Sequence, residues 1–231
     1  MESIEGRRIH SLAAQQRESG NFIEALKLAD EAMVAYATDQ DLLGFAEVHA
    51  ERFLTLKHLN DSTGFEGFLV SAKYAAETSV ELAEKSGDLK ALALPYFNLA
   101  KAQETLGELE EAVGSYKKAV ENIAQNPPKN HARSGVAADF RVHLATCEYK
   151  TGKKDALKEA EQALADLEAS EEEQYNKDVW TSGANMRIAE VLKEDNPTKA
   201  KEYLQKAKKI IDSNPELRLR LKHWEKLSAS F

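Results

Sequence analysis

Few residues of this 231-residue chain have the type and spacing that metal binding requires. His143 and Cys147 are four residues apart on one expected helix and could both face a metal ion. A structural zinc site needs about four ligands, however, and no third or fourth ligand stands in register with this pair. We therefore predict no metal site and interpret Cys147 as a buried packing residue.

A run of three glutamates, Glu171 to Glu173, is the second group with possible chemistry, because paired carboxylates can act as general acid and base. Negative charge in the first turn of a helix is already favoured by the helix dipole, so we interpret the run as structural. No glycine-rich phosphate loop, nucleophile elbow or His-Glu-x-x-His motif occurs in the sequence. We predict no catalytic residue, no cofactor and no enzyme activity.

The charge balance argues against nucleic-acid binding. The net charge is −8, whereas phosphate contacts need clustered lysine and arginine. Residues 193–226 hold ten basic and six acidic residues, which we interpret as a solvated face. The chain shows no signal peptide, no apolar run long enough to span a bilayer and a single cysteine, so we expect a cytoplasmic protein with no membrane partner.

The elements that position these residues are predicted to be helices. The sequence has 34 alanines and 26 leucines but only 17 valines and isoleucines together, a balance that favours helix over sheet. Small residues also recur at the spacing of one helix face, first as Ala25, Ala29 and Ala32, and such a stripe lets a neighbouring helix pack closely. Equivalent stripes return every 40 to 47 residues, which indicates a helical repeat array. Their leading alanines are Ala25, Ala72, Ala112, Ala156 and Ala200.

Each stripe marks the second helix of a hairpin, and a glycine such as Gly20, Gly107 or Gly152 is expected to end the first helix. Pro95 lies inside the fifth helix, where we expect a kink or a later start. The pattern predicts five hairpins and one last helix. Their ranges are 3–19, 21–37, 40–60, 65–86, 88–106, 108–126, 130–151, 153–169, 172–194, 197–212 and 215–229.

Capping residues mark several helix starts. Asn196-Pro197 and Asn214-Pro215 each pair an N-cap residue with a proline at the first helical position. Ser170 followed by Glu173 fits a capping box. Turn residues predict the longer loops at 60–67 and 126–130.

The repeat resembles the tetratricopeptide repeat, most closely over residues 96–127. The other four repeats match more loosely, residues 40–86 least, and all are longer than the usual 34 residues, as in long-helix variants. The resemblance implies an all-α fold, a right-handed α-solenoid of about five antiparallel helix hairpins plus a C-terminal capping helix at 215–229, within one domain at 1–231. The matching residues are Tyr96, Asn98, Leu99, Ala100, Gly107, Ala112, Tyr116, Ala119 and Pro127.

Proteins of this family typically bind peptides or partner proteins in a concave groove lined by first helices, and they are rarely enzymes. The resemblance therefore implies a protein-interaction module, a scaffold or adaptor, that is a monomer or a weak homo-oligomer. A carboxylate clamp including Asn98 is one interpretation, and a hydrogen bond from Asn98 to a neighbouring helix is the other. The partner-binding residues that the resemblance implies are Arg7, His10, Arg17, Asn98, Lys101, Glu104 and Arg187.

Two alternatives from other classes stay open. The chain could be a small-ligand-responsive regulator or a helical-repeat enzyme whose helix ends close on a pocket. That alternative would need acidic residues and a histidine at one depth of the groove, whereas the sequence scatters them. Exposed apolar positions such as Leu94 and Phe97 would instead favour self-association.

Overall fold

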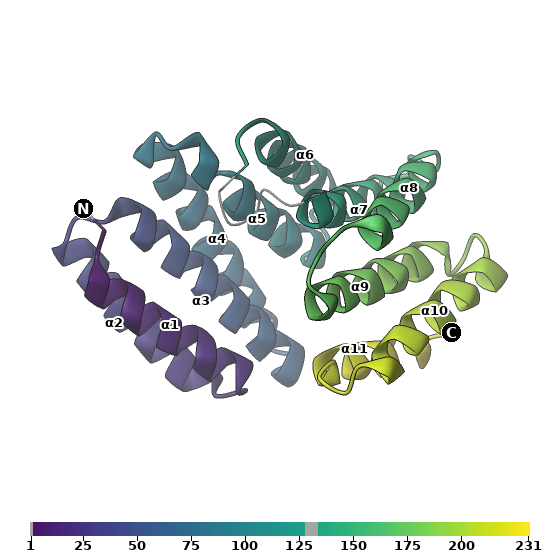
Figure 1. Cartoon of the computed structure of the whole chain (residues 1–231), viewed down its shortest axis with the longest axis horizontal. Coiled ribbons are helices and arrows are strands. Elements are labelled where there is room, and N and C mark those ends of the chain that lie inside the picture. The colour runs from purple at the N-terminus through teal and green to yellow at the C-terminus, as the bar shows by residue number, and fades with distance from the viewer. Residues whose placement is uncertain (1, 128–133) are drawn as a thin grey trace. The chain divides into compact units, whose positions relative to one another are not determined.

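The computed structural model describes residues 2–127 and 134–231, and within these residues every regular element is a helix (Figure 1). The all-α prediction is confirmed, as are eleven α-helices in the described residues. Their bounds are α1 (Ile4–Glu18), α2 (Phe22–Thr38), α3 (Leu42–Thr63), α4 (Glu66–Ser86), η1 (Leu89–Ala91, a 3₁₀ turn), α5 (Ala93–Thr105), α6 (Leu109–Gln125), α7 (Ser134–Lys150), α8 (Ala156–Ala169), α9 (Gln174–Leu192), α10 (Pro197–Ser213) and α11 (Arg218–Ser228).

Successive helices pack as five hairpins, α1–α2, α3–α4, α5–α6, α7–α8 and α9–α10. The alanine stripes are the reason for this close packing, because Ala25, Ala29 and Ala32 of α2 are completely buried. The same holds for Ala160 and Ala163 of α8. The first helices of neighbouring hairpins also contact one another, α1 with α3, α3 with α5, and α7 with α9.

Glycine ends the first helix of three hairpins, as the sequence predicts. Gly20, Gly107 and Gly152 have φ values of 81°, 82° and 99°, in the left-handed region that a side chain disfavours. The backbone can therefore reverse within a few residues and bring the second helix back along the first.

Two predicted boundaries shift. The helix expected from 88 begins at Ala93, with Pro95 in its first turn, so the later start expected at this proline is confirmed. The predicted loop at 60–67 is wrong, because α3 runs to Thr63 and α4 begins at Glu66. Gly64 and Phe65 make the connection, in which Gly64 turns the chain with φ of 71°.

The predicted caps have mixed outcomes. Asn196 caps α10 as predicted, accepting a hydrogen bond from the Lys199 N–H at 3.1 Å. The capping box is wrong, because α9 begins at Gln174 and the Ser170 hydroxyl donates to the Leu167 carbonyl, at the end of α8. Asn214 instead accepts from the Glu216 N–H at 3.1 Å in a turn, so the last helix starts three residues later than Pro215.

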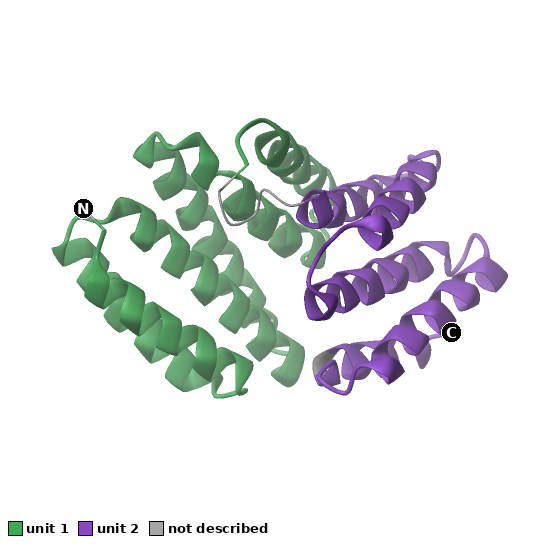
Figure 2. Cartoon of the chain, in the orientation of Figure 1, with its two compact units in different colours: residues 1–128 green, residues 129–231 purple. Residues whose placement is uncertain are grey.

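The helices form two compact units, residues 1–128 and 129–231 (Figure 2). Unit 1 holds α1 to α6 and unit 2 holds α7 to α11. The expectation of one domain at 1–231 stays a prediction. The predicted elbow at 126–130 and the predicted start of the seventh helix at 130 fall largely outside the described residues.

Candidate functional site

The candidate binding residues all lie on first helices. We call the exposed flank of α1, α3 and α5 the first-helix face of unit 1, and that of α7 and α9 the first-helix face of unit 2. Arg7, His10 and Arg17 lie on α1, and Arg187 lies on α9. Asn98, Lys101 and Glu104 lie on α5.

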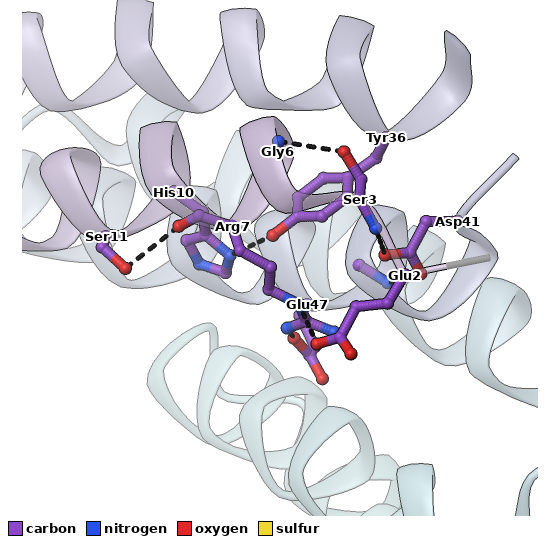
Figure 3. A network of polar contacts seen from close by, with 10 residues as sticks. Glu2, Ser3, Gly6, Arg7, His10, Ser11, Tyr36, Asp41 and Glu47 are labelled. Carbon is purple, nitrogen blue, oxygen red and sulfur yellow. Dashed lines mark hydrogen bonds and ion pairs between the residues drawn. The ribbon is translucent and has the colours of Figure 1, made fainter. Parts of the chain in front are cut away.

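Arg7 and His10 meet around the buried Tyr36 of α2 (Figure 3). The His10 Nδ1 lies 3.2 Å from the Tyr36 hydroxyl, and the Arg7 guanidinium lies 5.7 Å from the centre of the Tyr36 ring. Burial raises the pKa of Tyr36 to about 12, so the hydroxyl keeps its proton while it shares a hydrogen bond with His10. Arg7 also forms an ion pair with Glu47 of α3. Both residues therefore join helices of unit 1 to one another.

Two glycines make room for the Tyr36 ring. A Cβ atom built on Gly6 of α1 would lie 2.6 Å from Tyr36 Cδ1, and one on Gly44 of α3 would lie 2.2 Å from Tyr36 Cε1. Real Cβ atoms do not approach so closely, so the three helices meet at this distance only because glycine stands at both positions. Asp41 fixes the same corner by accepting from the Ser3 N–H and the Gly44 N–H, each at 2.9 Å.

Arg17 forms a largely buried ion pair with Glu51 of α3. The Arg17 Nε donates to Glu51 Oε1 at 2.7 Å, and the two side chains are 13% and 5% exposed. The Thr55 hydroxyl donates to the same oxygen at 3.2 Å. The charge of Arg17 is therefore engaged within unit 1. Sequence reasoning missed Glu47 and Glu51 because residues 40–86 match the repeat pattern least.

The α5 residues differ in their surroundings. Asn98 is 7% exposed, and its side chain makes no hydrogen bond to any residue within 2–127 or 134–231, which contradicts the interpretation that it bonds a neighbouring helix. The Lys101 ammonium lies 5.5 Å from the ring centre of Phe53 and 5.1 Å from that of Phe97. Glu104 turns toward α6 and accepts from the Tyr116 hydroxyl at 2.8 Å.

On unit 2, polar contacts join α7 to α9. The Arg187 Nε donates to the Thr146 hydroxyl at 3.1 Å, and the Lys150 ammonium lies 3.2 Å from a Glu190 carboxylate oxygen. Thr146 is 1% exposed, so Arg187 reaches inward from the first-helix face. These contacts are the counterpart in unit 2 of the ion pairs between α1 and α3.

Three histidines of unit 1 are held neutral. Burial lowers the pKa of His10, His49 and His58 from 6.5 to about 4. The nearest cations lower each pKa further, Arg7 for His10, Arg52 for His49 and Lys57 for His58.

Unit 1 is therefore expected to lose stability as the pH falls from 6.5 toward 4. The unfolded chain takes up protons on these histidines near pH 6.5, whereas the folded chain resists them until about pH 4, so the stability present at higher pH is lost through this window. His58→Phe keeps the ring that stacks on Phe22, 5.7 Å away, and removes one titrating group. Its thermal midpoint should fall less between pH 7 and pH 5 than that of the wild type. Equal falls of the thermal midpoint in the variant and the wild type would contradict this account.

No group of three or more histidine, cysteine, aspartate and glutamate side chains able to hold a metal occurs in the part of the chain that the structure describes. His143 and Cys147 are both on α7, where Cys147 is completely buried, as predicted. Among the described helices, none is both long and apolar enough to cross a membrane.

Solved structures with the same architecture decide the fold. A crystal structure of a putative kinesin light chain with nearly identical TPR-like repeats from Podosopora anserina aligns with a TM-score of 0.62 and 17% identity, over 90% of this chain and 94% of that one. The chain has a TPR-like repeat fold. BtubC (BKLC) from P. vanneervenii aligns with a TM-score of 0.64 and 23% identity, over 90% of this chain and 80% of that one. These TPR-like structures confirm the resemblance predicted from the sequence.

No family model and no curated protein matches the sequence of this TPR-like chain. Beyond the residues quoted above, support for the usual repeat pattern comes from the fold. The one close match to that pattern, residues 96–127, covers α5 and α6.

Proposed function

We propose that this TPR-like chain is a non-catalytic interaction module that binds an extended peptide segment of a partner protein across its first helices. TPR-like repeats are generally protein-interaction scaffolds, and the fold is the first support for the proposal. The net charge of −8 favours a protein or peptide over a nucleic acid. The single cysteine, Cys147, needs no oxidising compartment, which supports a cytoplasmic location.

The observation that carries the proposal is the side chain of Asn98. A mostly buried amide without a hydrogen-bond partner in the protein is unfavourable, so a fold rarely keeps one without a use. Asn98 as a whole is 7% exposed, and its amide has no partner in the described residues but still reaches the surface. An amide offers donors and an acceptor, and the backbone of an extended peptide presents both. We infer that Asn98 bonds the peptide backbone.

Lys101 supplies the second contact, one turn after Asn98 on α5. Its ammonium lies over the rings of Phe53 and Phe97, so a positive charge and two aromatic side chains stand side by side. This combination suits a peptide that places an apolar side chain beside an acidic one.

The other candidate residues act less directly in this proposal. Arg7, His10 and Arg17 hold α1 against α2 and α3, and so fix the position of α1 in the first-helix face of unit 1. Glu104 and Arg187 each bond a neighbouring helix and flank the peptide path in their own unit.

The test selects peptides that bind the intact chain from a displayed library of random sequences and measures their affinity by calorimetry. Asn98→Ala is expected to weaken binding about tenfold, because two or more amide hydrogen bonds are lost. Asn122→Ala is the matched control, since Asn122 lies on the second helix α6 and bonds the Lys118 carbonyl of the same helix. Equal affinities of the two variants would refute binding at Asn98, and so would a library that yields no binder.

A further inference from the structure

An arginine of the last helix lies on the first-helix face of unit 2. A Cβ atom built on Gly183 of α9 would lie 3.2 Å from Cζ, 3.2 Å from Nη2 and 3.3 Å from Nη1 of Arg220. Three nearly equal distances mean that the flat guanidinium of Arg220 rests face-on over Gly183. The glycine leaves the space that the guanidinium fills, and the N–H groups lie in the plane of the guanidinium, at its edge.

The positive charge of Arg220 lacks a matching partner. Across residues 2–127 and 134–231, no hydrogen bond and no ion pair to its guanidinium is present. The charged and titratable groups near it are Asp139 of α7 and Arg187 and Tyr175 of α9. Desolvation lowers the pKa of Arg220, the Arg187 cation lowers it further, and Asp139 and Tyr175 oppose this.

The surroundings of Arg220 hold an excess of positive charge. A second guanidinium, that of Arg187, acts on Arg220 together with one carboxylate, that of Asp139, which lies 3.9 Å from the His143 ring nitrogen as well. A half-buried cation without a close partner is unfavourable, so proteins normally pair it with an anion. Arg220 still reaches solvent, so an anion from outside can approach its free edge.

The attachment of the last helix gives no reason for this arginine. The Trp224 indole N–H donates to the Leu204 carbonyl at 2.9 Å, and the ring packs on the core of unit 2. Phe231 packs on the same core, under the Lys193 ammonium. An apolar side chain at position 220 would fill the space over Gly183 without carrying an unpaired charge inward.

We propose that the first-helix face of unit 2 holds an oxyanion-binding site in which the Arg220 guanidinium binds one oxyanion over Gly183. The planar guanidinium presents a fork of N–H donors that matches two oxygens of a carboxylate or a phosphate. The α11 helix is then part of a binding site as well as a cap on the repeat. This site goes beyond the proposed peptide contact at Asn98, which lies in unit 1, and either can fail alone.

The test follows the Gly183 amide signal by NMR while acetate or inorganic phosphate is added to the intact chain, with sodium chloride as the control for ionic strength. The wild type is expected to show a saturable shift with at least one oxyanion. Arg220→Gln should weaken that binding about tenfold or more, since charge-assisted hydrogen bonds are lost. The tighter of the two probes identifies the group that the site takes.

Arg218→Gln is the matched control, because Arg218 is an exposed arginine on the same helix and loses the same charge. It should retain the affinity of the wild type. Gly183→Ala gives a second test, because the new methyl group displaces the guanidinium without removing its charge, and it should weaken the same binding. Circular dichroism verifies that each variant folds. The site is refuted if chloride reproduces the shift, if neither oxyanion saturates, or if Arg220→Gln and Arg218→Gln behave alike.

Discussion

Arg17→Met is expected to lower the unfolding free energy of unit 1 by about 3–5 kcal/mol, the largest effect of any single change considered. The reason is the carboxylate that would stay behind. Glu51 is 5% exposed, and without Arg17 its remaining described partner is the hydroxyl of Thr55. An unpaired charge in that position costs far more than the ion pair itself contributes. Urea unfolding followed by circular dichroism measures the change.

Arg8→Met is the matched control for Arg17→Met. Arg8 lies on the same helix and pairs with Glu5 one turn away, but both side chains are more than half exposed. Such a surface pair contributes about 0.5 kcal/mol or less, so its loss should change the unfolding free energy very little. The double variant Arg17→Met with Glu51→Leu should recover most of the lost stability, because no buried charge remains. Equal effects of Arg8→Met and Arg17→Met would contradict a buried, structural ion pair.

Gly44→Ala should destabilise unit 1 by about 2 kcal/mol, although alanine is the better helix former. The added methyl group would fall 2.2 Å from Tyr36 Cε1, and Tyr36 is completely buried between α1, α2 and α3. The ring cannot withdraw without parting these helices or breaking the contact with His10. The urea midpoint measures the loss.

Gly114→Ala is the opposite case in the same unit. Gly114 lies inside α6, is exposed, and would give its Cβ open space on all sides. The substitution should therefore raise the unfolding free energy by about 1 kcal/mol, the helix propensity difference alone. Opposite signs for the two glycine variants are the expected result, and a stabilising Gly44→Ala would show that the Tyr36 corner is not tightly packed.

These two predictions bear on the proposed function. Arg17 belongs to the set of residues that the repeat resemblance implies for partner binding, yet its charge is engaged with Glu51. A loss of binding in an Arg17 variant would reflect a weakened fold. Asn98 and Lys101 are better probes of the binding face, because Asn98 carries no charge and the Lys101 ammonium lies beside the rings of Phe53 and Phe97.

The sequence by itself determined the helical hairpins of this protein. The spacing of alanines such as Ala25, Ala29 and Ala32 encodes which face of a helix is buried, and Gly20 and Gly107 encode where the chain turns. These are local signals, since each depends on residues within one or two helical turns. For that reason the fold class and the pairing of helices could both be predicted.

Only the tertiary structure decided which polar side chains bond to other helices of the same chain. The sequence shows Arg7 and Arg17 as cations at binding positions, but their partners Glu47 and Glu51 are 34 to 40 residues away, on α3. Likewise the guanidinium of Arg220 meets Gly183, 37 positions earlier in the chain. No local pattern encodes such contacts, because the distance between side chains on different helices is set by how closely the helices pack.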